Sequence, residues 1–191
     1  MKLFISFSVA ASLLFAGCGN EHRPVPRPYA WPRTVMMGDS LREIDFESVK
    51  WLVNSEADVT VRRATKEVVW VDISYPPYNA TLYLTISFAE GAALDSAIDN
   101  RLQRISLNLG QASAERRDIS STSGEFEGIM LRATSPVTTP LQFLATDDKR
   151  VAVSGVLVME QAAVNPDSLA PAIYALHSEF KQALSSLSYD I

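Results

Sequence analysis

The sequence contains one cysteine, Cys18, among 191 residues. A single cysteine excludes an internal disulfide and any metal site built on several thiolates. Histidine is almost as scarce, since only His22 and His177 occur. These two lie far apart, and neither has a second ligand at a spacing typical of metal sites, so we expect no bound metal. We interpret His177 as a partly exposed helix residue.

The sequence also lacks an excess of positive charge and long apolar runs. Its formal net charge is −5, which disfavours binding to nucleic acid through a basic surface. Beyond the N-terminus, no apolar stretch approaches the roughly 20 residues that a membrane-spanning helix needs. Because 47% of the residues are hydrophobic, the chain can form a core, and its length suits one domain with a tether.

Catalytic motifs are missing as well. The chain has no Gly-x-Ser-x-Gly elbow, no Gly-x-Gly-x-x-Gly and no phosphate-binding loop. Residues 178–181 match the Ser-x-x-Lys spacing of some serine acylases, but the companion Lys-Thr-Gly does not occur, so we interpret the match as chance. The pair Asp147 and Asp148 is typical of a solvated turn rather than a calcium or acid–base site. We therefore expect a protein without catalytic residues or cofactors that is not an enzyme.

The N-terminus has the pattern of a bacterial lipoprotein precursor. Lys2 precedes an apolar stretch over residues 3–15, which is too short to span a membrane and fits the core of a secretory signal. Small residues then lead directly into Cys18. We predict a signal peptide over residues 1–17 and lipid attachment at Cys18, where two acyl chains, palmitate among them, would give stable anchoring. An ordinary cleaved signal is the alternative, with Cys18 as a buried thiol.

Residues 18–33 form a proline-rich segment, with prolines at 24, 26, 28 and 32. This spacing favours an extended chain that could hold the following domain roughly 35–40 Å from the lipid. A flexible leader without a spacer role is equally compatible with the composition. We take residues 34–191 as the folded domain.

Hydrophobic periodicity predicts an α+β fold for that domain. Strands are expected over residues 68–73, 81–88, 129–134, 141–146 and 151–158, with one or two short strands between residues 44 and 59. Residues 111–124 are polar and are expected to form turns. Helices are expected over residues 93–109 and from about residue 169, the second with an apolar stripe of Ile173, Leu176, Phe180 and Leu184. We predict a single domain with a mainly antiparallel sheet packed against two main helices.

A proline turn with two flanking tyrosines, Tyr75-Pro76-Pro77-Tyr78, interrupts the predicted strands. Aromatic side chains on a stiff turn lose little entropy on binding, so Tyr75 and Tyr78 are candidates for a protein-contact surface. The same two rings could equally form a lid at the edge of the sheet. The sequence leaves both readings open.

Several segments together resemble one known family over nearly the whole predicted mature chain. They are the small residues before Cys18, the run Pro26-Arg27-Pro28-Tyr29, residues 75–82, the strand–turn–strand region 129–158 and Asn165-Pro166-Asp167-Ser168-Leu169-Ala170-Pro171. In this order they resemble the gliding motility-associated lipoprotein family GldD of the Bacteroidetes. None of these segments is a catalytic signature.

The resemblance implies a non-enzymatic accessory lipoprotein needed for gliding motility and for the type IX protein secretion system. Its partners would be other envelope proteins of that machinery. Only Glu21 is acidic near Cys18, which favours the outer membrane, facing the periplasm, over surface display. The alternative function is a periplasmic lipoprotein hydrolase or a small-ligand-binding lipoprotein, which a pocket with convergent polar groups would favour. An exposed aromatic patch would favour protein contact instead.

Overall fold

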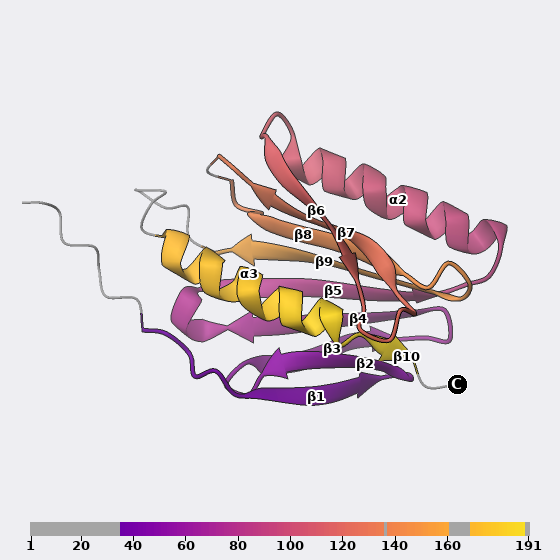
Figure 1. Ribbon diagram of the computed structural model, residues 1–191, viewed down its shortest axis with the longest axis horizontal. Helices are drawn as coiled ribbons and strands as arrows, with labels where there is room; N and C mark the ends of the chain where they lie inside the picture. Colours follow the sequence, from indigo (N-terminus) through magenta and orange to yellow (C-terminus); the bar gives the residue numbers. More distant parts are fainter. Residues whose placement is uncertain (1–34, 136, 161–168, 190–191) are drawn as a thin grey trace, which may run out of the picture. The chain divides into compact units, whose positions relative to one another are not determined.

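The computed structural model describes residues 35–135, 137–160 and 169–189. The predicted signal peptide, Cys18, His22 and the tether over residues 18–33 lie outside these residues, as do residues 165–168 of the family-like segment. The described residues form ten strands, two α-helices and one short 3-10 helix (Figure 1). In chain order the elements are β1 Leu41–Phe46, β2 Val49–Asn54, β3 Asp58–Ala64, β4 Val68–Tyr75, η1 Pro76–Tyr78, β5 Ala80–Phe88, α2 Ala92–Leu109, β6 Ala114–Ser120, β7 Glu127–Ala133, β8 Leu141–Thr146, β9 Val151–Met159, α3 Ala170–Ser185 and β10 Ser188–Tyr189.

The strands form two antiparallel sheets. The large sheet has seven strands in the order β3-β4-β5-β9-β8-β7-β6, and the small sheet has three in the order β1-β2-β10. Strands β5 and β9 are separated in sequence by α2 and β6 to β8, but they are direct neighbours in the sheet. Leu82 pairs with Leu157 and Leu84 with Gly155. The α+β fold with a mainly antiparallel sheet and two main helices is therefore confirmed.

Alternation of side chains gives the large sheet two different faces. In β5, Leu82, Leu84 and Ile86 are fully buried on one face, which we call the closed face. Tyr83 and Thr85 point to the opposite face, which we call the open face. Helix α3 lies over the closed face and α2 over part of the open face (Figure 1).

An aromatic cluster fills the closed face. The ring of Trp51 on β2 stacks on Phe143 of β8, with ring centroids 5.4 Å apart, and Phe180 of α3 meets Phe143 edge-on at 6.0 Å. Gly155 on β9 makes room for this cluster, because a Cβ atom there would collide with the Phe143 ring. Full burial of side chains of this size contributes about 1.5–3 kcal/mol each, so this layer supplies much of the stability of the fold.

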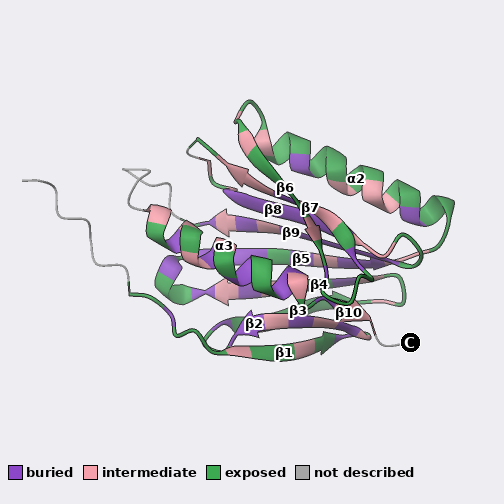
Figure 2. Cartoon of the chain, viewed as in Figure 1, coloured by how far each residue is buried: buried purple, intermediate pink, exposed green. Residues whose placement is uncertain are grey.

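The open face is covered only in part. Leu94 and Ile105 of α2 pack against Leu144 and Ala152 in a small second cluster. Most other positions of α2 remain exposed, in contrast to α3, which alternates buried and exposed residues along its length (Figure 2). Helix α2 is thus held by few side chains.

Both edges of the large sheet carry charged side chains. Strand β6 is one edge and presents residues 115–118, Glu-Arg-Arg-Asp, nearly all of them exposed. Strand β3 is the other edge, and its register with β4 shifts between Val61 and Arg63. Charges and a bulge on an edge strand discourage pairing with another chain.

The predicted strands at 68–73, 81–88, 129–134, 141–146 and 151–158 and both predicted helices are confirmed to within a few residues. Two expectations were wrong. Residues 111–124 contain the strand β6, and three strands rather than one or two precede β4. These missed strands are largely exposed edge strands, so they lack the apolar alternation on which strand prediction depends.

The turn predicted at Asp147 and Asp148 is confirmed. Asp147 Oδ1 accepts hydrogen bonds from the backbone N–H groups of Lys149, Arg150 and Val151 at 3.0, 2.8 and 2.7 Å. Asp148 adopts a left-handed conformation with φ of 56°. Asp147 therefore organises the turn between β8 and β9 through its carboxylate.

Candidate functional site

The structure corrects the proposal that Tyr75 and Tyr78 form a contact surface. Tyr75 is fully buried and Tyr78 is 6% exposed, whereas Pro76 and Pro77 face solvent. The 3-10 turn directs both rings inward: Tyr75 Oη donates to Glu179 Oε1 at 2.9 Å, and the Met37 N–H donates to Tyr78 Oη at 3.0 Å. Both tyrosines therefore hold segments of the domain together and are not available to a partner.

Glu179 is a buried carboxylate that the sequence did not reveal. It lies on α3 between Ser178 and Lys181, which are both exposed, and it also accepts a hydrogen bond from the Asn54 N–H at 3.1 Å. Burial raises the pKa of Glu179, and burial together with Glu179 raises the pKa of Tyr75 well above its usual value. The sequence does contain a sign that Glu179 is buried. Position 179 lies three residues after Leu176 and therefore on the apolar side of the helix.

His177 is half-buried on α3, which confirms its interpretation as a partly exposed helix residue. Burial lowers its pKa, and the neighbouring cations Arg117, Arg132 and Lys181 lower it further. Arg132 in turn pairs with Glu115 at 2.8 Å. This group is a surface charge network between α3 and strands β6 and β7.

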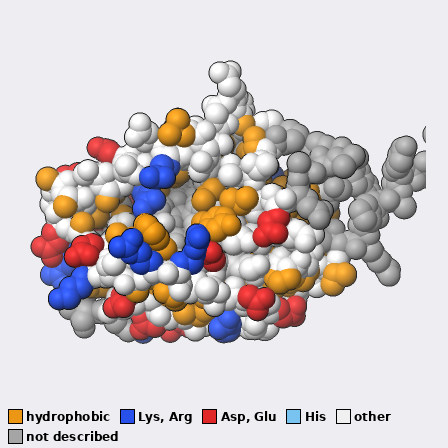
Figure 3. Space-filling view, turned by 180° about the vertical axis from the view of Figure 1, so that it is seen from behind, with side chains coloured by type: hydrophobic (Ala, Val, Ile, Leu, Met, Phe, Trp, Pro, Cys, Tyr) orange, Lys and Arg blue, Asp and Glu red, His pale blue; other side chains and the backbone are white. Residues whose placement is uncertain are grey.

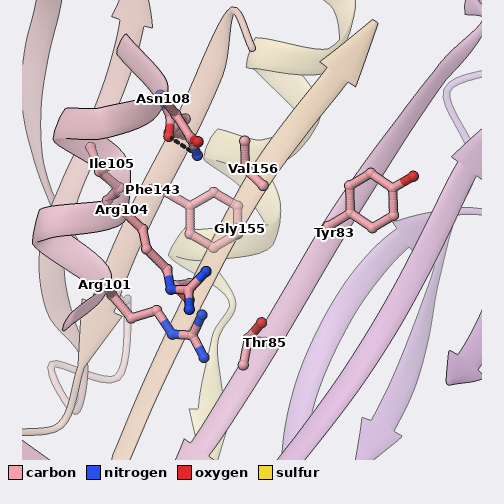
Figure 4. Close-up of a pocket in the computed structure, with 11 residues that line it drawn as sticks. Tyr83, Thr85, Arg101, Arg104, Ile105, Asn108, Phe143, Gly155 and Val156 are labelled. Atoms are coloured by element: carbon pink, nitrogen blue, oxygen red, sulfur yellow. Dashed lines mark hydrogen bonds between the residues drawn. The ribbon is translucent and has the colours of Figure 1, made fainter. Parts of the chain in front are cut away.

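The open face contains a cleft between α2 and strands β5, β9 and β8 (Figure 4). Its volume is about 330 Å³. Arg101, Arg104 and Asn108 reach it from α2, and Gln142 of β8 forms part of its wall. The cleft thus brings polar side chains of α2 and β8 together on this face.

Helical spacing explains why these α2 residues reach the cleft. Arg101, Ile105 and Asn108 recur at intervals of four and three residues and so lie on one side of the helix. Ile105 is 7% exposed and anchors that side on the sheet. Leu102, the residue after Arg101, is 40% exposed, so it points away from the sheet.

Gln142 is the most unusual residue of the cleft. It is 1% exposed, and its Oε1 accepts a hydrogen bond from Asn108 Nδ2 at 3.1 Å. Among the described residues, its Nε2 has no hydrogen-bond partner. A buried amide with one end unpaired is rare in folded proteins, because the lost contact with water is not replaced.

The two arginines of the cleft are electrostatically unbalanced. None of the ion pairs formed within the described part of the chain involves Arg101 or Arg104. Arg104 Nε donates to Asn100 Oδ1 at 3.0 Å. The two terminal NH2 groups of Arg104 take no part in this hydrogen bond. Burial lowers the pKa of Arg101, and the like charge of Arg104 adds to this effect.

Beside the cleft, the open face carries exposed aromatic side chains. Trp70 on β4 is 41% exposed and Tyr83 on β5 is 39% exposed. The Arg63 guanidinium lies 5.4 Å from the centroid of the Trp70 ring, within the range of a cation–π contact. Seen from behind, the molecule shows hydrophobic side chains gathered near its centre with Lys and Arg beside them (Figure 3).

The described residues contain neither a metal-binding cluster nor a membrane-spanning helix. Over residues 35–135, 137–160 and 169–189, no three His, Cys, Asp or Glu side chains are placed to hold a metal ion. In the same part of the chain, no helix is both long and apolar enough to cross a membrane.

Comparison with known families is decisive. The family described as gliding motility lipoprotein GldD matches residues 21–189. The chain belongs to this family. Membership of the GldD family makes the protein a gliding motility lipoprotein, and it confirms the resemblance seen in the sequence.

Other comparisons add less to the GldD assignment. No curated protein matches the sequence. Among solved structures, the chain is similar to cyanobacterial PsbP (CyanoP) from Synechocystis sp. PCC 6803, with a TM-score of 0.48 and 15% sequence identity, over 79% of this chain and 93% of that one.

Proposed function

We propose that this GldD-family lipoprotein is a non-enzymatic accessory factor of gliding motility and of type IX secretion, and that it acts by binding other envelope proteins. Family membership supports the motility role. The observation that supports protein contact is the exposed group formed by Trp70, Tyr83 and Arg63 on the open face. We call this group the aromatic surface.

The composition of the aromatic surface suits an interface. Tryptophan, tyrosine and arginine are the residues that most often dominate binding energy at protein contacts. The planar rings lose little conformational entropy on binding. The aromatic surface therefore replaces Tyr75 and Tyr78 as the candidate contact site.

Cross-linking in living cells tests the contact directly. A photo-reactive amino acid at position 70 should form a cross-link to a type IX or gliding component, because Trp70 would lie in the interface. The same amino acid at position 174 is the matched control, since Tyr174 is 59% exposed on α3, across the sheet. Specific products from position 174 and none from position 70 would refute the assignment of the surface.

Substitution gives a functional readout of the same contact. The double variant Trp70→Ala and Tyr83→Ala should weaken partner binding about 30-fold or more and reduce colony spreading and secretion, since interface hot spots contribute at least ~2 kcal/mol. Tyr174→Ala should leave both processes at the wild-type level. Normal spreading and secretion with the folded double variant would contradict a role in the machinery.

We further propose that Cys18 carries the acyl chains and holds the protein at the outer membrane, facing the periplasm. The sequence pattern before Cys18 and the lipoprotein family support this anchor. Cys18→Ala should abolish metabolic labelling with a palmitate analogue and release the protein from sedimented membranes. Labelling that persists in this variant would refute the attachment site, and digestion by protease added to intact cells would refute the periplasmic orientation.

A further inference from the structure

We propose that the cleft beneath α2 binds a small organic anion, which presents an oxyanion group, carboxylate or phosphate, to Arg101 and Gln142. This site borders the aromatic surface, because Tyr83 also lines the cleft, but the two proposals are argued from different side chains. It names a class of ligand, a small organic anion, for the small-ligand-binding alternative that the sequence left open.

The buried amide of Gln142 points to a bound ligand. Its Oε1 is held by Asn108 Nδ2, so its NH2 group is the unpaired end. An unpaired buried donor destabilises a fold, and a bound ligand or ion is one of the few explanations for such a group in a native protein. An NH2 group can only donate, so the missing partner is a hydrogen-bond acceptor.

The positive charge of the cleft suits an anion. Arg101 and Arg104 extend from successive turns of α2 toward β5, where Thr85 lies opposite (Figure 4). The mutual repulsion of these guanidinium groups would be relieved by an anion, and guanidinium binds carboxylate and phosphate through paired hydrogen bonds. The chain as a whole carries a net charge of −5, so this local concentration of positive charge runs against its overall balance.

The size and lining of the cleft suit a small ligand. A volume of about 330 Å³ falls at the lower end of the range for small-ligand sites. Ile105 and Val156 supply apolar wall on either side of the polar groups. A site with a few convergent donors between apolar walls suits an anion with a short carbon skeleton.

The test uses the full-length lipoprotein in detergent, titrated by calorimetry at fixed ionic strength with citrate, glycerol 3-phosphate, neutral glycerol and a glutamate-rich peptide. At least one small anion should bind with a saturating curve, and glycerol should not bind. Binding of citrate alone assigns a carboxylate ligand, and binding of glycerol 3-phosphate alone assigns a phosphate ligand. No binding of either anion at roughly 10 mM, or binding only to the peptide, would overturn the proposal.

Charge variants separate the cleft from general electrostatic attraction. Arg101→Gln should weaken binding about 10-fold or more, because hydrogen bonds to charged groups are the strongest contacts that the cleft can offer. Arg116→Gln is the matched control, since Arg116 is exposed on β6 and pairs with Asp118. Equal weakening by both variants would overturn the site.

A second variant works even if Arg101→Gln folds poorly. Gln142→Met keeps the side-chain volume but removes the amide. It should leave the melting temperature of the ligand-free protein unchanged or raise it, because an unpaired buried donor is lost, while weakening binding about fivefold or more. A lower melting temperature with unchanged affinity would show that Gln142 is structural and would overturn the proposal.

Discussion

The closed and open faces of the large sheet share the same strands but differ in what covers them. On the closed face, the Phe143 ring packs against Trp51 of the small sheet and Phe180 of α3. On the open face, α2 is held by few buried residues, and Trp70 and Tyr83 remain exposed beside a polar cleft. Because alternate residues of one strand serve opposite faces, stability and recognition can be separated within a single sheet.

This separation determines where substitutions should act. Residues of the closed face are surrounded by other side chains, so their truncation leaves a cavity. Trp70 and Tyr83 on the open face are already partly hydrated, so their truncation should affect binding more than folding. Matched residue types on the two faces allow this difference to be measured.

The two tryptophans provide the largest expected difference. Trp51 is 1% exposed and Trp70 is 41% exposed. Trp51→Ala should lower the free energy of unfolding by about 3–5 kcal/mol, because it removes a ring stacked in the core. Trp70→Ala should change it by less than about 1 kcal/mol. Urea unfolding followed by circular dichroism measures both, and equal losses would mean that the open face is part of the core.

Tyr75 and Tyr83 allow the stability of the two faces to be compared for the loss of a single hydroxyl group. Tyr75→Phe should lower the free energy of unfolding by about 1–3 kcal/mol, because Glu179 loses a donor in a buried site. Tyr83→Phe on the open face should change it by less than about 0.5 kcal/mol. The same unfolding measurement applies, and a neutral Tyr75→Phe would show that Glu179 finds another donor.

The smallest expected effect is a dependence of folding stability on pH, caused by Glu179 on the closed face. Burial raises the pKa of Glu179 in the folded protein above its ordinary value of 4.5, so the folded state holds this proton more tightly than the unfolded state. The wild type should therefore lose stability relative to Glu179→Gln as pH rises from about 4.5 through the folded pKa.

Chemical unfolding of both proteins at a series of pH values between about 4 and 7 measures this difference. Glu43→Gln, which removes an exposed carboxyl on β1, is the control for the loss of one negative charge. It should retain the wild-type decline. A stability difference that grows in favour of the wild type as pH rises would show that folding lowers the pKa of Glu179 instead.

Sequence periodicity predicted the elements with a one-sided apolar pattern. Strands β5, β8 and β9 and helix α3 carry such a pattern and were found close to their expected bounds. Strand β6 was missed because its exposed charges do not distinguish a sheet edge from a loop. Periodicity reports burial against a core, so it does not register strands that contribute little to that core.

The candidate sites were harder to predict because they depend on which segments meet. Tyr75 and Tyr78 had the composition of exposed anchors, and only the direction of the 3-10 turn shows that they are buried. Arg101 and Gln142 are distant in sequence and come together because α2 packs across β8 and β9. One signal was available: Gln142 is a lone amide in a strand whose other residues before Thr146 are apolar, which indicates a polar neighbour on one face.

The charged edges of the large sheet have a further consequence for a protein of this family. A lipoprotein is confined to the plane of a membrane, where neighbouring copies meet far more often than they would in solution. Exposed strand edges in such a crowded layer could join into continuous sheets and aggregate. The arginine and acidic side chains along β6 and the register shift in β3 therefore oppose edge-to-edge pairing between neighbouring copies.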